Sequence, residues 1–93
     1  MTSNEQPTTS AHAGEMRTLI QEIAKVLVDS PAEVSVTPVE EREETVLELR
    51  VAPGDLGKVI GKQGRTARSL RTILAAASVK FQERYALEII EEE

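Results

Sequence analysis

Two stretches of the chain carry apolar residues at helical spacing. In residues 15–28 and again in residues 65–79, apolar side chains recur every three or four positions. This period places them on one face of a helix, so we expect an amphipathic helix in each stretch. Pro31 ends the first helix, because the residue before a proline is pushed out of the helical region. The residues expected to face inward are Met16, Leu19, Ile20, Ile23 and Leu27 in the first helix and Ala67, Leu70, Ile73, Leu74 and Ala77 in the second.

Three shorter stretches alternate between apolar and polar residues, which predicts β-strands at residues 33–39, 45–51 and 84–90. The charged residues 40–44 leave only a short turn between the first two strands, so these should pair as an antiparallel hairpin. The glutamates of this turn could be imagined as a metal site, but a charged hairpin turn is the favoured interpretation. Pro38 cannot donate to a strand ladder and therefore indicates an edge strand or a bulge. The alternating faces are Val34 with Val36, then Leu47, Leu49 and Val51 against Val46, Glu48 and Arg50, and finally Tyr85, Leu87 and Ile89 against Ala86, Glu88 and Ile90.

A glycine loop lies between the hairpin and the second long helix. Residues 55–60 fit a short helix with Asp55 suited to its N-terminus, and Gly-Lys-Gln-Gly follows at residues 61–64. Glycine at both ends lets the backbone turn sharply and lets a ligand approach closely. The next helix begins near Arg65, so its unpaired N–H groups point back toward the loop and suit a phosphate. KH domains clamp single-stranded nucleic acid with a loop of this kind.

Two other phosphate-binding loops do not match. A Walker loop needs Gly-x-x-x-x-Gly-Lys-Ser/Thr, but Leu56 stands at the first glycine and Gln63 replaces the hydroxyl residue. The dinucleotide pattern Gly-x-Gly-x-x-Gly fails because Gly57 stands four residues before Gly61. A lone Gly-x-x-Gly is a weak signal, but its place between two helices, after a hairpin and before a last strand, strengthens it.

Charge is distributed unevenly along the chain. The net charge is −5, but residues 57–84 hold seven basic residues and one acidic residue, while the remainder carries −11. A basic patch on an acidic body is typical of a nucleic-acid-binding surface. Charge alone leaves equally open that these side chains only solvate a helix face. The seven basic residues are Lys58, Lys62, Arg65, Arg68, Arg71, Lys80 and Arg84.

Composition narrows the function classes further. The 93 residues fit one small domain, and the absence of cysteine excludes disulfides and thiolate metal sites. The single histidine, His12, lies in a polar stretch at residues 1–13 that we expect to be a disordered tail, and no nucleophile–base pair can be assembled. We therefore expect neither catalysis nor a cofactor. Phe81 and Tyr85 are too few for the ring platforms of RRM and OB domains, and Tyr85 is expected in the core. No signal peptide or membrane-spanning run is visible, so we expect a cytoplasmic protein.

The elements together predict an α/β (α+β) fold in the order α-β-β-α-α-β, with helices on one face of a three-stranded sheet. The expected domain spans residues 14–90 and is followed by an acidic tail at residues 91–93. Residues 52–65 and 70–74 closely resemble the KhpA family of bacterial single-KH-domain RNA-binding proteins, in which the domain is a type II KH domain. The resemblance covers roughly residues 15–90.

This resemblance implies a cytoplasmic protein that binds single-stranded RNA, pairs with itself and pairs with a second KH protein similar to KhpB. It also implies an RNA chaperone or post-transcriptional regulator linked to cell elongation, cell shape and cell wall organization. The alternative is a protein–protein interaction module whose KH fold mainly serves dimerisation or partner docking. The polar N-terminal tail and the acidic C-terminus depart from the usual short member of the family.

The expected RNA-binding residues lie in the loop and on the two helices that flank it. The two glycines shape the loop, Lys62 and Gln63 face phosphates, and the remaining cations add long-range attraction. The full set is Lys58, Val59, Ile60, Gly61, Lys62, Gln63, Gly64, Arg65, Arg68 and Arg71. Candidates for the walls or floor of an apolar groove are Val59, Ile60, Leu70, Val46 and Leu49, although each could instead pack in the core, Leu49 and Leu70 above all.

The second long helix also carries small residues, Ala75 and Ala76, outside its inward stripe. With Thr72 and Val79 they form a low-relief, weakly apolar surface on which another helix could lie. Alanine also favours helix formation by itself, which would explain these residues without any partner. The resemblance to a self-associating family favours a partner, so we expect a homodimer with residues 65–79 near its interface.

Overall fold

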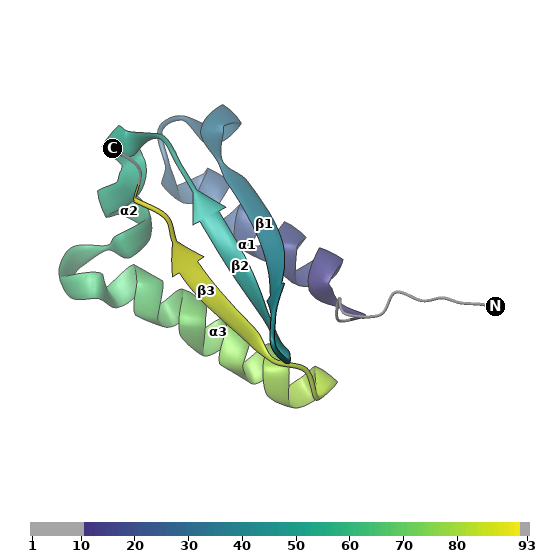
Figure 1. The fold of residues 1–93 in the computed structure, drawn as a ribbon. Coiled ribbons are helices and arrows are strands. Elements are labelled where there is room, and N and C mark those ends of the chain that lie inside the picture. The colour runs from purple at the N-terminus through teal and green to yellow at the C-terminus, as the bar shows by residue number, and fades with distance from the viewer. Residues whose placement is uncertain (1–10, 92–93) are drawn as a thin grey trace.

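The computed structural model describes residues 11–91, in which helices cover one face of a three-stranded sheet (Figure 1). The elements are α1 (Ala13–Leu27), β1 (Ser35–Glu41), β2 (Glu44–Arg50), α2 (Leu56–Ile60), α3 (Arg65–Phe81) and β3 (Tyr85–Ile89), with 3-10 turns at Pro31–Glu33, Pro53–Asp55 and Lys62–Gly64. The predicted order is confirmed, and each predicted boundary lies within two residues of the observed one. None of the described helices is long and apolar enough to cross a membrane.

The strand order in the sheet is β1-β2-β3, with β1 antiparallel and β3 parallel to the central strand β2. The predicted hairpin is confirmed, and its turn places Arg42 at a φ of 59°. Pro38 of β1 stands opposite Leu47 of β2. Strand β1 lies at the edge of the sheet, as the proline predicts. The parallel β3 returns beside β2 only after α2 and α3, so the glycine loop lies within this crossover (Figure 1).

The core is formed by the inner sheet face and one stripe from each long helix. Its fully buried side chains include Ile20, Leu47, Leu49, Val59 and Leu74, and Tyr85 is also buried, as expected. On α1 the buried residues are Ala13, Met16, Ile20 and Ala24.

The expected inward position is wrong for three residues. Leu19 and Leu27 are each 37% exposed, and Ile73 is 40% exposed. The buried stripe of α1 runs instead through Ala13 and Ala24, whose small side chains let the helix lie close to the sheet. Leu19 and Ile73 sit at the margins of their stripes, where a sheet of only three strands offers too little surface to cover them.

The expected tail lies partly outside the described residues, which begin at Ala11 and end at Glu91. Ala11 to Ala13 belong to the folded part, because α1 begins at Ala13 and this side chain is only 2% exposed. The expected domain boundary at residue 14 therefore falls inside the first turn of α1.

Candidate nucleic-acid interface

The glycine loop joins the end of α2 to the beginning of α3. Gly61 has φ 79° and ψ 169°, which is accessible to glycine but not to other residues, and a Cβ there would overlap the Thr66 hydroxyl. Gln63 and Gly64 follow in left-handed backbone with φ of 56° and 73°. The N–H of Gly64 donates to the carbonyl oxygen of Gly61 over 3.0 Å and closes the turn. The spacing of the two glycines thus reflects two positive-φ positions three residues apart.

The cations at this loop point into solvent. Lys62, Arg65 and Arg68 are exposed, and within residues 11–91 no ion pair or side-chain hydrogen bond engages their charged groups. Gln63 is exposed beside them. The loop adjoins the N-terminus of a 17-residue helix, where the unpaired N–H groups and the helix dipole favour negative charge. The arrangement can hold a phosphate by backbone, side chain and dipole together.

Two expected site cations are already engaged. Lys58 Nζ lies 3.4 Å from Asp29 Oδ2 and 3.9 Å from Asp55 Oδ1. The Arg71 guanidinium donates to the carbonyl oxygen of Leu87 in β3 over 3.3 Å. A groove of about 230 Å³ runs between α3 and β3 at this point and is lined by Arg71, Leu74, Tyr85, Ala86 and Leu87. Arg71 thus lies beside β3, apart from the turn formed by residues 61–64.

The apolar candidates divide by burial. Val59 has no exposed surface, and Leu49, Leu70 and Val46 are 7% exposed or less, so these side chains support the fold from beneath. Ile60 is half-buried at the end of α2, directly before the loop. Of the five apolar residues expected at a groove, only Ile60 retains surface that a ligand could contact.

Asp55 does not cap its own helix as predicted, because its side chain bonds no N–H of α2. Its carboxylate oxygens instead accept hydrogen bonds from the N–H groups of Asp29 and Ser30, over 3.2 and 3.0 Å. These two residues follow α1, so no local pattern around Asp55 indicates the contact. The side chain is buried, with 3% exposure.

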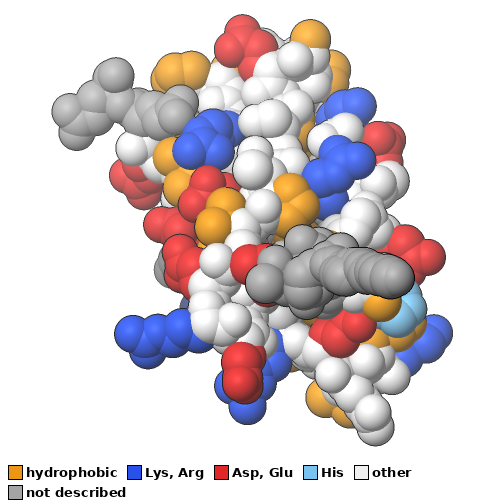
Figure 2. Space-filling model, turned by 45° about the vertical axis from the view of Figure 1, so that its right-hand side comes forward, with side chains coloured by type: hydrophobic (Ala, Val, Ile, Leu, Met, Phe, Trp, Pro, Cys, Tyr) orange, Lys and Arg blue, Asp and Glu red, His pale blue; other side chains and the backbone are white. Residues whose placement is uncertain are grey.

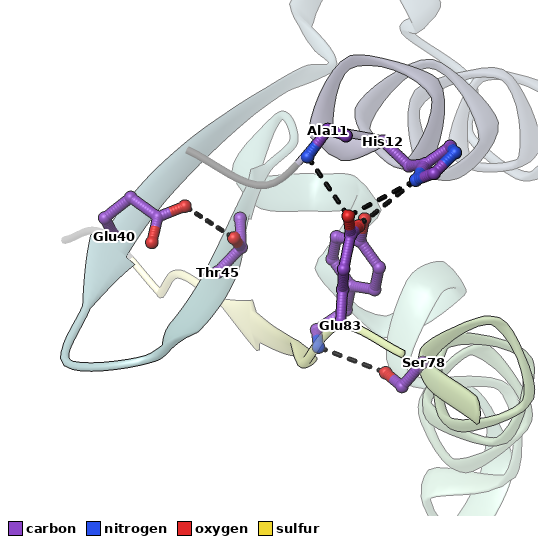
Figure 3. A network of polar contacts seen from close by, with 7 residues as sticks. Ala11, His12, Glu40, Thr45, Ser78 and Glu83 are labelled. Carbon is purple, nitrogen blue, oxygen red and sulfur yellow. Dashed lines mark hydrogen bonds and ion pairs between the residues drawn. The ribbon is translucent and has the colours of Figure 1, made fainter. Parts of the chain in front are cut away.

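A second polar cluster, at the opposite end of α3, has no counterpart among the sequence predictions (Figure 3). The His12 ring stacks on Phe81 with centroids 3.8 Å apart and an interplanar angle of 10°. Glu83 accepts hydrogen bonds from the Ala11 N–H over 3.2 Å and from the Tyr85 hydroxyl, and its Oε1 lies 3.3 Å from His12 Nδ1. The bond from Tyr85 holds the pKa of Glu83 below its usual range, against a smaller opposing effect of desolvation. The expectation that His12 lies in a disordered tail is wrong.

The face of the molecule that carries this cluster shows no basic patch among the described residues. Basic side chains are scattered over it without forming a continuous patch, and several acidic side chains lie along its left edge in the view (Figure 2). Glu83 and His12 are 71 positions apart in the sequence. A local pattern such as the alternation that predicts β3 therefore gives no sign of this contact.

The glycine loop, the crossover that carries it and the strand order are those of a KH domain, and comparison with known proteins agrees. The family model described as "KhpA/KhpB, KH domain" matches residues 17–89, which include the loop and all three strands. The chain belongs to this family. The matched region begins within α1 and ends at the last residue of β3.

Several curated members of the family are similar over most of the chain. The RNA-binding protein KhpA of Clostridium acetobutylicum is 53% identical over 75 residues, which cover 81% of this chain and all of that protein. The Treponema pallidum protein of the same name is 56% identical over 73 residues, 78% of this chain and 91% of that protein. The Aquifex aeolicus protein is 51% identical over 76 residues, 82% of this chain and 96% of that protein.

Proposed function

We propose that this chain is a non-catalytic protein that binds single-stranded RNA through the loop at residues 61–64. The observation that carries the proposal is the loop itself: two positive-φ glycines, an exposed lysine between them and two exposed arginines beside it, all three cations without ion-pair partners in residues 11–91. The KhpA proteins that resemble it are named as RNA-binding, which supports the same ligand. A phosphate at the loop would be held without displacing an internal contact of Lys62.

The groove between α3 and β3 supplies a place for bases beside the phosphates. β3 is an edge strand, and Tyr85 N–H and Leu87 O on its outer side already bond Ser78 Oγ and the Arg71 guanidinium. Leu74 and Leu87 give the groove an apolar floor. Since a single short module reads few bases, we expect weak sequence preference and a large contribution from phosphate contacts.

The test replaces Lys62 and Gln63 together by Asp, which places negative charge where phosphates should lie and leaves both glycines unchanged. Affinity for a single-stranded RNA should fall about tenfold or more, because charge-assisted bonds are lost and repulsion is added. The measurement is a fluorescence anisotropy titration, with circular dichroism to verify the fold. RNA affinity that stays unaltered in the folded variant contradicts the proposal and favours the protein-interaction module.

The chain offers a matched control at the other end of α3. Lys80 and Gln82 are the same residue types, both are exposed, and Gln82 has the same φ of 56° as Gln63. Replacing Lys80 and Gln82 by Asp changes the net charge by the same amount, far from the loop. RNA affinity should change much less in this variant, since only long-range attraction is affected.

We further propose, from family membership, that the protein acts in the cytoplasm as an RNA chaperone or post-transcriptional regulator. A KH protein similar to KhpB would be its partner, and cell elongation and shape the process affected. Co-purification of such a protein and of RNA with the tagged chain, followed by sequencing of the RNA, tests these statements together.

Self-association through α3 belongs to the same proposal. Val79 is 79% exposed, and Ile73, which periodicity places in the core, adds apolar surface near the exposed Ala76. We expect a homodimer at micromolar concentration that Ala76→Arg converts to a monomer while preserving the fold, because a long charged side chain prevents close approach of another helix. Sedimentation showing a monomer for the unmodified protein at high micromolar concentration rules this out.

A further inference from the structure

Asp55 connects two parts of the molecule that are distant in sequence. Its carboxylate accepts the N–H groups of Asp29 and Ser30, 26 and 25 positions earlier, in the turn that follows α1. An ionised carboxylate that is 3% exposed is unfavourable unless it is well hydrogen-bonded, and these two charge-assisted bonds satisfy it. The contact is therefore a firm attachment rather than an incidental surface interaction.

The attachment lies at one end of the element that ends in the glycine loop. Asp55 directly precedes α2, and Gly61 directly follows it. At about 1.5 Å per residue, the six steps from Asp55 through α2 to Gly61 span only about 9 Å. A short helix that is held at the residue before its first turn transmits a shift at that residue to its last residue. Lys58, on the same helix, reaches the same turn through Asp29.

We infer that Asp55 is a positioning residue for RNA binding: by holding the start of α2 to the end of α1, it sets the position of the loop at residues 61–64. This inference rests on the proposed function. Asp55 does not itself contact RNA, because it is buried and its two oxygens face backbone N–H groups. It acts only through α2.

Positioning and charge make opposite predictions for this residue. Removing a negative charge near a phosphate-binding loop should strengthen RNA binding if only long-range attraction matters. Removing the attachment should weaken binding, because the loop loses its fixed position. The sign of the change therefore distinguishes the two effects.

The experiment compares Asp55→Asn with Asp29→Asn. Both variants lose one negative charge and one acidic partner of Lys58, but within residues 11–91 the Asp29 side chain engages only that lysine and is 79% exposed. The amide introduced by Asp55→Asn can accept one backbone N–H and opposes the other with its own NH2 group. We expect Asp55→Asn to weaken RNA binding about fivefold or more, and Asp29→Asn to leave it unchanged or slightly stronger.

Two further measurements and one further variant keep the result decisive. The fraction folded is measured by circular dichroism at the titration temperature, and the apparent affinity is corrected by that fraction, so partial unfolding does not mimic the effect. The amide resonances of Gly61 and Gly64 should shift in Asp55→Asn and not in Asp29→Asn. Asp55→Glu, which keeps the charge but displaces the carboxylate, should also weaken binding.

Equal corrected affinities for Asp55→Asn and Asp29→Asn overturn the inference while leaving the proposed function intact. A wild-type protein that fails to bind any single-stranded RNA instead overturns the proposed function. The comparison of the two variants thus tests the inference, and the wild-type titration tests the proposed function.

Discussion

At one end α3 begins behind Gly64, and at the other it stops before Gln82, with left-handed backbone at both positions. Each end has a nearby lysine and a positive-φ glutamine: Lys62 and Gln63 before the helix, Lys80 and Gln82 at its end. At the first end no ion pair within residues 11–91 engages Lys62. At the second, Lys80 Nζ lies 5.4 Å from the centre of the Phe81 ring, which also stacks on His12.

The difference lies in how each end satisfies its charges. Helix N-termini carry partial positive charge and helix C-termini partial negative charge. At the loop, exposed cations lie beside the positive N-terminus of α3. The positive electrostatic potential there is therefore complemented only by an anion that does not belong to the described part of the chain. The far end places Lys80 near a negative terminus and holds the Glu83 carboxylate with Ala11 and Tyr85, so its charges are met internally. The N-terminal end of α3 is thus suited to bind an anion, whereas the contacts at its C-terminal end stabilise the fold.

The strongest way to break this contrast is at Gly61. Gly61→Ala should abolish measurable RNA binding and destabilise the fold by about 1–3 kcal/mol, because a side chain there is strained and meets Thr66. Gly64→Ala is the milder comparison, since its Cβ would point into open space and only the left-handed backbone opposes it. Thermal unfolding and RNA titration of both variants measure the difference. Equal losses at the two positions would falsify the asymmetry.

The second prediction concerns the far end and acid. Because the pKa of Glu83 is lowered in the folded protein, its contribution to stability is present above the ordinary carboxyl pKa of 4.5. That contribution disappears as the pH falls through the lowered value. Glu83→Gln should therefore destabilise the protein near neutral pH and should lose less stability than the wild type on acidification. Urea unfolding across this pH range checks the prediction, with RNA affinity at neutral pH expected to remain unchanged.

Glu22→Gln is the matched control for that experiment, because in the described part of the chain Glu22 pairs only with Lys25, on the exposed surface of α1. Its unfolding free energy should follow the wild-type pH dependence closely, since exposed pairs contribute little. If the unfolding free energy of Glu83→Gln also fell on acidification as it does in the wild type, the stability of the cluster would not depend on this carboxylate.

The smallest expected effect is on salt dependence. With about 3–4 phosphates contacted and about 0.7 ions released per contact, log affinity should fall against log salt with a slope near −2 to −3. Lys62→Ala should reduce this slope by about 0.7, whereas Lys80→Ala should leave it unchanged. Titrations over a series of salt concentrations measure all three slopes. A slope of zero for the wild type points to apolar or protein-type recognition instead.

The element order, the hairpin, the edge position of Pro38 and the Gly-x-x-Gly loop followed from the sequence by itself. Each depends on neighbours within a few residues: helical period, strand alternation, the missing N–H of proline and the tolerance of glycine for positive φ. The exposed position of Lys62 was also predictable, because a residue between two such glycines has little chain around it.

Only the tertiary structure decided which charged groups are internally engaged. Lys58 and Arg71 look like Lys62 in the sequence, yet one pairs with Asp29 and the other bonds Leu87. Asp55 resembles a helix cap and instead binds the turn after α1, while His12 resembles a tail residue and stacks on Phe81. These contacts join residues that are far apart along the chain, so the local sequence pattern does not predict them. They arise because packing the helices against three strands brings the ends of α1 next to α2 and to the end of α3.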